Sequence, residues 1–292
     1  MQSFSRTVER CRPLLGTFVR IRVEGLAPDR AHAAIDAALD TITTIHRLMS
    51  FRDAGSDVSR LNREACREPV PVDQHTLEVL MRAAGFSRIS DGRFDVTVAP
   101  ELVARGLLPA PEGAPMPDAK ADWRDIVFLE NGTIGFHKPL WIDLGGIAKG
   151  YAVDCAIAAL RAFSPTKASV NAGGDLRVAG EGYERIRLMP DGCDDKLVAV
   201  ADVENGSVAS SCGRMSRKAS GIGGPHVGPR RDSPAGAWQF VSVMAPHCAD
   251  ADALTKVVMA MGEESAPILS IYAAGALTCD QRFGWRGIGS FP

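Results

Sequence analysis

The segment from Trp141 to Phe163 reads WIDLGGIAKGYAVDCAIAALRAF, and its pattern decides how the rest of the chain is interpreted. A short apolar run ends in Asp143, two glycines follow, and Lys149 opens a stretch with apolar residues at spacings of three and four. That spacing predicts an amphipathic helix after a tight glycine turn. Glycines at a helix start let a ligand approach the backbone, and the free N–H groups there favour an anion such as phosphate.

The loop at residues 143–150, DLGGIAKG, matches neither of the two common phosphate-binding patterns. The Gly-x4-Gly-Lys-Ser/Thr spacing of a P-loop is absent, and the glycines fall as Gly-Gly-x3-Gly rather than as a dinucleotide fingerprint. On spacing alone, two interpretations stay open. The loop binds a phosphate with Lys149 as a point charge, or it is a strand-to-helix turn that carries a surface lysine.

The composition of the 292 residues is typical of a soluble globular protein, with 46% apolar residues, 23% charged residues and a net charge of −2. This charge gives no indication of a nucleic-acid partner, and no run reaches the roughly 18 apolar residues of a membrane helix. Seven cysteines without a C-x-x-C pair favour a reducing compartment over a zinc site or disulfide framework. Since the N-terminus also lacks the apolar core of a signal peptide, we expect a cytoplasmic protein without a membrane segment.

Hydrophobic periodicity predicts an α+β fold, because long helices alternate with runs of hairpin-linked strands that suit an antiparallel sheet. Helices are predicted over residues 28–50, 56–64, 75–87 and 250–261, besides the central helix. Strands are predicted over residues 17–23, 126–129, 133–136, 167–171, 175–179, 184–189, 197–203, 207–211 and 238–245, with a final strand within 268–279. Asn131-Gly132 indicates a hairpin with a primed turn, and no element is predicted after Cys279.

Seven segments resemble, in the same order, the motifs of the ApbE family, the FAD:protein FMN transferases. DLGGIAKGYAVD, residues 143–154, resembles the family signature. The other six are LGTFVRIRV (15–23), MSFRDAGSDVSRLNRE (49–64), DGRFDVTVAP (91–100), SVNAGGDLRVAG (169–180), GSVASSC (206–212) and DADALTKVVMAMG (250–262). The resemblance implies one α+β domain of the T-fold-like kind, in which two related halves combine antiparallel sheets with packed helices. We place this domain at residues 14–280, with an N-terminal extension at 1–13 and a C-terminal tail at 281–292.

The resemblance also implies an activity. FAD would lie across the glycine loop with its pyrophosphate near Mg²⁺, and FMN would pass to a threonine or serine hydroxyl of an acceptor flavoprotein while AMP leaves. Two alternatives use the same site: a flavin-binding protein without turnover, and an FAD pyrophosphatase that releases FMN and AMP to water.

Site residues follow from the resemblance by position. Asp252 and the backbone carbonyl of Gly146 are the implied metal ligands, and Thr255 would reach the ion through a bound water. His226 and Asp252 form the implied catalytic pair. The implied FAD contacts are Leu15, Arg52, Arg93, Phe94, Asp95, Asp143, Lys149 and Arg230. For Asp95 the alternative is a carboxylate that caps a turn.

The chain departs from the family pattern at Lys256, where many relatives carry a threonine that binds the metal. An ammonium group beside Mg²⁺ is electrostatically unfavourable, so the two compete for one position. Lys256 therefore either weakens or replaces the metal, or it turns away and pairs with Asp252 or Glu263.

Two further departures affect the implied chemistry. Relatives carry H-x-x-D-P-R-T-G, whereas this chain reads HVGPRR at 226–231, one residue shorter and without the aspartate. His226 remains the candidate general base, with a solvated loop histidine as the alternative, and Arg230 is placed to contact phosphate. Arg52 aligns with an aromatic that stacks on FAD; its guanidinium can stack on a flavin, or Phe51 takes that role.

Overall fold

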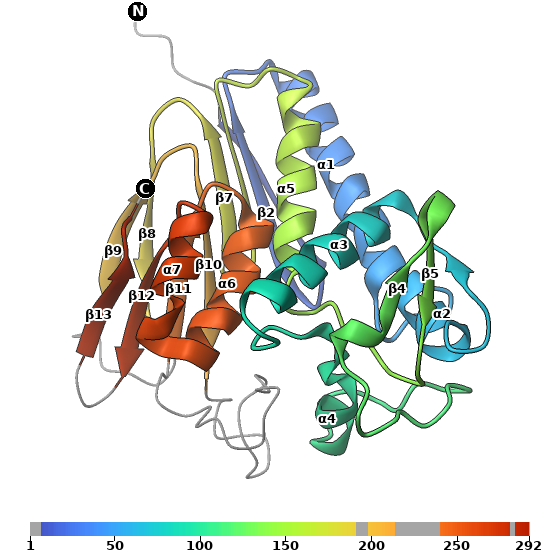
Figure 1. Cartoon of the computed structure of the whole chain (residues 1–292). Coiled ribbons are helices and arrows are strands. Elements are labelled where there is room, and N and C mark those ends of the chain that lie inside the picture. The colour runs from blue at the N-terminus through green and yellow to red at the C-terminus, as the bar shows by residue number, and fades with distance from the viewer. Residues whose placement is uncertain (1–6, 191–197, 214–239, 281–283, 292) are drawn as a thin grey trace, which may run out of the picture.

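A computed structural model describes residues 7–190, 198–213, 240–280 and 284–291. Its central feature is an eight-stranded sheet in the order β1-β2-β6-β7-β10-β11-β12-β13, in which every neighbouring pair is antiparallel (Figure 1). The strands are β1 (Thr7–Leu14), β2 (Thr17–Glu24), β6 (Lys167–Ala172), β7 (Asp175–Gly180), β10 (Ser207–Cys212), β11 (Phe240–Ala245), β12 (Gly275–Asp280) and β13 (Gly284–Gly289).

The sheet divides into two halves of four strands with the same chain order. In the first half the pair β1–β2 is followed by helices and then by β6–β7, and in the second half β10–β11 is followed by helices and then by β12–β13. The halves join between β7 and β10, where the register contains only Ser207 opposite Arg177 and Val208 opposite Leu176. This arrangement agrees with the two related halves that the resemblance implies.

Four helices cover one face of the sheet: α1 (Pro28–Met49), α5 (Ala148–Arg161), α6 (Cys248–Met261) and α7 (Ala266–Ile271) (Figure 1). The alternation of β2 explains this choice of face, because side chains of a strand point to opposite sides in turn. Val19, Ile21 and Val23 are fully buried, whereas Phe18 on the other side is 70% exposed. The main hydrophobic core therefore lies between the sheet and the helices.

A two-stranded sheet of β8 (Glu184–Leu188) and β9 (Ala199–Val203) packs on the opposite face near the middle of the large sheet. The second, smaller core that it closes consists of Leu176, Val178, Leu188, Val203, Val208, Phe240 and Cys279. Along β7 and β10, residues of this core alternate with residues that face the helices, so this part of the sheet is covered on both sides.

Residues 51–140 build a smaller region beside the helices, with a three-stranded sheet in the order β3-β5-β4 (Figure 1). Its elements are β3 (Val70–Pro71), β4 (Ile126–Phe128), β5 (Thr133–Phe136), α2 (Asp57–Glu64), α3 (Gln74–Ile89) and α4 (Ala99–Ala104). Its short 3-10 turns are η1 (Val96–Val98), η2 (Trp123–Asp125) and η3 (Glu130–Gly132), and a further one outside this region, η5 (Gly262–Ser265), follows α6. Its apolar residues belong to the same core cluster as those of the large sheet, so the α+β single-domain prediction is confirmed.

The predicted helices and strands are present, with boundaries shifted by a few residues. Asn131 and Gly132 both have positive φ, 58° and 70°, as the primed turn requires. Residues 7–13 and 284–289, which the sequence places outside the domain, instead belong to the two edge strands of the sheet, β1 and β13. Neither has the alternation of a half-buried strand; the second reads GWRGIG, and the first contains Pro13, a residue that edge strands tolerate. Within the described ranges, every helix is too short or too polar to cross a bilayer.

Candidate active site

The glycine loop that precedes α5 is fixed by hydrogen bonds from two other segments. The Asp143 carboxylate accepts the N–H of Gly145 at 3.1 Å, which closes the turn, and the N–H of Asp143 donates to the carbonyl of Val96 at 2.8 Å. The Asn62 amide pairs with both backbone groups of Ile142, at 2.8 and 3.1 Å, as a neighbouring strand would. Asn62 lies in the segment MSFRDAGSDVSRLNRE, but the sequence alone assigned it no role. It is the one asparagine of that segment, and this is the feature that could have identified it.

Gly146 is the point where three distant segments meet. A Cβ atom built on Gly146 would lie 3.6 Å from Cε2 of Phe94 and 3.6 Å from Cε of Lys256. Phe94 is buried and packs against Phe86 with a ring separation of 5.7 Å. The structure therefore brings together three predicted site segments, residues 91–100, the glycine loop and α6.

Four charged residues form a compact group that we call the Asp252 cluster: Lys149, Asp175, Asp252 and Lys256. The Lys149 ammonium group pairs with Asp175 and lies 3.5 Å from Oδ2 of Asp252. The Lys256 ammonium group donates to Oδ1 of Asp252 and, at 3.1 Å, to its backbone carbonyl. The carboxylates are buried, at 0% and 1% exposure, while the side chains of Lys149 and Lys256 keep 33% and 19%. Lys149 is thus not the isolated surface lysine of one early interpretation.

Burial and mutual charge set the ionisation of this cluster. Burial and the neighbouring Asp252 charge raise the pKa of Asp175 to about 6. Burial alone would raise the pKa of Asp252, but Lys149 and Lys256 hold it below its ordinary value. Burial alone would lower the pKa of Lys149, but Asp252 and Asp175 raise it. Two ammonium groups and two carboxylates therefore balance each other near neutral pH.

Asp154, the last residue of the DLGGIAKGYAVD motif, positions the helix that carries Asp252. Its two carboxylate oxygens accept the N–H groups of Cys248 and Ala249 at 2.9 Å each, at the start of α6, and it also pairs with Arg177. A Cβ atom on Gly150 of α5 would lie 2.2 Å from the Cys248 carbonyl oxygen, so only glycine permits this helix approach. Asp154 was part of the recognised motif but received no role from the sequence.

Thr255 points toward the sheet. Its hydroxyl bonds to the backbone carbonyl of Asp252 at 2.7 Å and to the Ser211 hydroxyl of β10 at 2.8 Å, and the residue is fully buried. This arrangement ties α6 to β10.

A resident Mg²⁺ ion would need oxygen ligands that are free to coordinate it. The oxygens of Asp252 already have donors: Lys256 on Oδ1, the N–H of Gly150 at 3.2 Å on Oδ2, and the Thr255 hydroxyl on the backbone carbonyl. The Lys256 side chain also lies against Gly146, the other implied ligand. Among the described residues, no group of three or more His, Cys, Asp or Glu side chains is arranged to hold a metal. The residues that the structure describes therefore do not fit a resident Mg²⁺.

Asp95 and Leu15 both occupy turns near this site. Asp95 accepts the N–H and the hydroxyl of Thr97 at 2.8 Å each, as a carboxylate that caps a turn does, and burial raises its pKa to about 6. Leu15 has φ of 55° in the β1–β2 turn. Thr17, two residues after Leu15, lies against Gly173, because a Cβ atom added to Gly173 would be 2.5 Å from the Thr17 hydroxyl. Gly173 lies in the turn between β6 and β7, two residues before Asp175.

The other predicted contacts are less well placed or fall outside the structure. Arg52 is exposed and donates to the carbonyl of Leu107 at 3.2 Å. Phe51 is buried in the main core. Arg93 is half-buried in the loop before Phe94. His226 and Arg230 lie outside the described residues.

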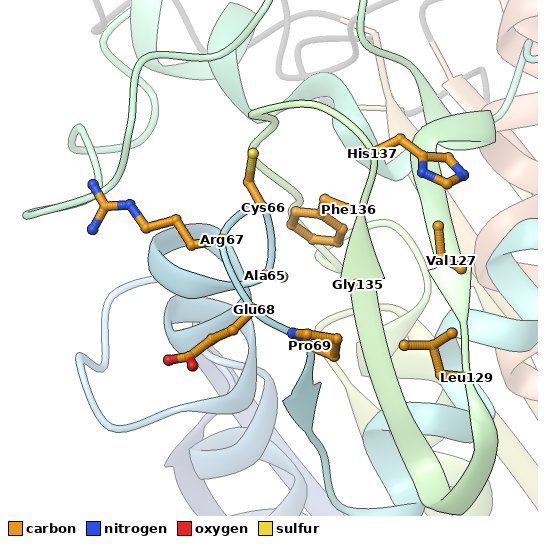
Figure 2. Close-up of a pocket in the computed structure, with 10 residues that line it drawn as sticks. All are labelled: Ala65, Cys66, Arg67, Glu68, Pro69, Val127, Leu129, Gly135, Phe136 and His137. Carbon is orange, nitrogen blue, oxygen red and sulfur yellow. The ribbon is translucent and has the colours of Figure 1, made fainter.

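A surface pocket of about 230 Å³ lies elsewhere, where the end of α2 meets β4 and β5 (Figure 2). Cys66 and His137 line one end of it, and the side chain of Arg67 points away. The N–H of Phe136 donates to the carbonyl of Ala65 at 2.8 Å across this junction. The pocket is a seam between packed elements, and none of its lining residues belongs to the glycine loop or to the Asp252 cluster.

The chain is similar in sequence to a family of known proteins. The ApbE family pattern matches residues 15–273. The FAD:protein FMN transferase of Treponema pallidum is 26% identical over 290 aligned positions, which cover 89% of this chain and 80% of that protein. The FAD:protein FMN transferase of Vibrio cholerae is 28% identical over 273 positions, covering 86% and 80%.

Solved structures agree with the fold. The crystal structure of the ApbE protein from Thermotoga maritima has a TM-score of 0.81 at 26% identity and covers 97% of each chain. The flavin transferase ApbE from Vibrio cholerae has a TM-score of 0.80 at 23% identity, covering 98% of this chain and 97% of that one. With a family match over most of its length, the chain belongs to the ApbE family.

Proposed function

We propose that the protein is an FAD:protein FMN transferase that attaches FMN to a threonine or serine of an acceptor flavoprotein. The activity is the one named for its curated relatives. The observation that carries the proposal is the Asp252 cluster beside the N-terminus of α5, where two partly exposed ammonium groups lie next to a glycine loop. Such a position favours a pyrophosphate, since helix N–H groups and cations both attract anions.

In the proposed reaction, the acceptor hydroxyl oxygen attacks the phosphorus of the FMN half of FAD. The bond from that phosphorus to the bridging oxygen breaks, and AMP leaves with the bridging oxygen and its electron pair. The hydroxyl proton passes to a general base, for which we propose His226. The product holds FMN as a phosphate ester of the acceptor.

The charges of the Asp252 cluster supply the electrostatic part of this proposal. Lys149 and Lys256 would neutralise the pyrophosphate and the charge that develops on AMP, while the buried carboxylates of Asp175 and Asp252 hold both ammonium groups in place. The resemblance implies Mg²⁺ in this role. We assign no step to that ion, because the donors already bound to Asp252 leave its oxygens engaged.

Further contacts with FAD are proposed from position. Phe94 and Asp143 belong to segments that meet at Gly146, and Asp95 and Arg93 flank Phe94, so these residues would line the flavin or pyrophosphate. Leu15, Arg52 and Arg230 are proposed contacts from the family motifs alone. We also propose that the protein acts in the cytoplasm, since Cys11, Cys66, Cys155 and Cys248 are free thiols.

The proposal is tested by incubating the purified protein with FAD and a peptide that carries the family's threonine acceptor site. Mass spectrometry should find an FMN adduct on the peptide together with one AMP, and no adduct on a matched peptide with valine in place of threonine. FMN and AMP without an adduct would instead identify an FAD pyrophosphatase. FAD that binds but stays intact would identify a flavin-binding protein.

A further inference from the structure

Lys256 lies between the glycine loop and the buried carboxylate of Asp252. Its Cε atom is 3.6 Å from the Cβ position of Gly146, and its ammonium group donates to Oδ1 and to the backbone carbonyl of Asp252. The two residues are four positions apart on α6, which places them on the same face of the helix. We propose that the Lys256 ammonium group takes the place of a divalent cation and acts as a fixed counter-charge for the pyrophosphate of FAD. This inference rests on the proposed function.

Charge balance within the cluster supports the substitution. Lys149 and Lys256 carry two positive charges, and Asp175 and Asp252 carry two negative charges. With threonine at position 256, the cluster would keep one excess negative charge and an open oxygen on Asp252, which together attract a cation. Lysine supplies that positive charge from the chain itself. A divalent ion could enter only by displacing the ammonium group and then facing its charge at close range.

The exposure of the cluster indicates which group a ligand would meet. The Asp252 side chain has no exposed surface, whereas Lys256 keeps 19% of its side chain accessible. An ammonium group has three N–H donors. Within the described part of the chain, two of them serve the carboxylate and the carbonyl of Asp252, and the third remains for a phosphate oxygen.

The test compares the wild-type protein with Lys256→Thr, using Mn²⁺ as a paramagnetic substitute for Mg²⁺ and FAD in excess. Electron paramagnetic resonance measures the free Mn²⁺ signal, with FAD and Mn²⁺ alone as the blank. We expect the wild-type protein to leave this signal unchanged and the variant to remove about one Mn²⁺ per chain, since the site then presents free oxygen ligands. The matched control is Lys138→Thr. It removes a lysine whose ammonium group lies 3.0 Å from the Asp125 carboxylate, and neither residue belongs to the Asp252 cluster. This variant should behave as the wild type.

Activity gives a second, separate readout. In EDTA the wild-type protein should keep its rate of FMN transfer, while Lys256→Thr should lose about 100-fold and recover with Mg²⁺, because one charged contact to the reacting group is missing. If Lys256→Thr fails to fold, Lys256→Gln serves instead: it keeps a donor, loses the charge, and should weaken FAD binding in EDTA.

The outcomes separate this inference from the proposed function. Stoichiometric Mn²⁺ binding by the wild-type protein with FAD, or equal Mn²⁺ binding by the wild type and Lys256→Thr, would overturn the role of Lys256. A wild-type rate that disappears in EDTA and returns with Mg²⁺ would overturn it as well. Absence of FMN transfer under every condition would overturn the transferase, and the Mn²⁺ measurement would still decide the role of Lys256.

Discussion

Two aspartates connect α5 and α6, one on each helix, and they differ in the cationic side chains that pair with them. Asp154 on α5 accepts N–H groups from the start of α6, and Asp252 on α6 accepts the N–H of Gly150 on α5. Asp154 forms an ion pair with Arg177, whose side chain is only 11% exposed. Asp252 forms ion pairs with two lysines, Lys149 and Lys256, whose side chains remain partly accessible. The first carboxylate closes a structural contact, whereas the second holds positive charge where a ligand can reach it.

The strongest way to break both contacts at once is to change Gly150, which lies where the two helices touch. Gly150→Ala would place a Cβ atom 2.2 Å from the Cys248 carbonyl, so we expect the free energy of unfolding to fall by about 3 kcal/mol or more. Urea unfolding followed by circular dichroism measures it. Gly85→Ala is the matched control, because Gly85 lies on α3 and a Cβ atom added there meets nothing within 4 Å. This variant should raise the free energy of unfolding by about 0.5–1 kcal/mol. Equal behaviour of the two variants would contradict the close helix approach.

Removing the charge of Asp252 should damage chemistry beyond its effect on stability. Asp252→Asn leaves Lys149 and Lys256 with excess positive charge and misplaced, so FMN transfer by the folded protein should fall about 100-fold to 1,000-fold. Stability should also fall by about 3 kcal/mol, because a buried pair loses one partner. The control is Asp202→Asn, in an exposed pair with Arg185, which should change neither quantity. Normal transfer rates in the folded Asp252→Asn protein would remove Asp252 from the active site.

Removing the charge of Asp154 should reduce stability but leave FMN transfer almost unchanged. Asp154→Asn loses hydrogen bonds to the start of α6 and the pair with Arg177, so we expect a loss of about 2–3 kcal/mol in the free energy of unfolding. FMN transfer per folded molecule should stay close to that of the wild type. Asp36→Asn, in a mostly exposed pair with Arg10, serves as the control for a lost surface charge. A large loss of FMN transfer per folded molecule would show that Asp154, like Asp252, serves the active site and not only the stability of the fold.

The smallest expected effect concerns pH and Asp95, whose pKa burial raises from its ordinary value of 3.8 to about 6. The folded state therefore binds this proton more tightly than the unfolded state does. The resulting stability is fully present below pH 3.8 and is lost as pH rises through 6. Asp95→Asn keeps an oxygen for the Thr97 contacts but has no proton to lose, so its free energy of unfolding should decline by about 2 kcal/mol less than that of the wild type between pH 4 and 7. Identical pH profiles from urea unfolding would show that Asp95 does not titrate in this range.

Much of the fold follows from sequence because its helices and inner strands have clear periodicity. The strand Thr17–Val23 buries the apolar residues Val19, Ile21 and Val23 of its alternating pattern. The helix after Lys149 is present, but its buried face is not the predicted one: Ala158 is exposed, whereas Val153, Ile157 and Leu160 are buried. The edge strand GWRGIG was missed because its glycines erase the alternation, and its pairing with β12 is a long-range property of the sheet. The short helix α7 was also missed, since six residues carry too little periodicity to identify it.

The candidate site was predictable where one motif contains its parts, and less so where the parts are distant. Lys149 and Asp252 were expected to lie near FAD from their motifs. The pairing of Lys149 with Asp175, 26 residues away and read only as the start of a strand, depends on how β7 lies beside α5. Lys256 pairs with Asp252, as one early alternative states, yet it does not turn away from the loop, because Gly146 lies against its stem. Helix spacing predicted the pair, but only the packed structure places it.

The short junction between β7 and β10 has a consequence for how the molecule comes apart. The register between β7 and β10 has two residue pairs, and the contacts between α5 and α6 add to the connection of the two halves. Lys149 and Asp175 belong to the first half, and Asp252 and Lys256 belong to the second. A ligand gripped by both ammonium groups would therefore act as a clasp across the halves and slow their separation. Resistance to proteases would then rise and fall with the supply of that ligand.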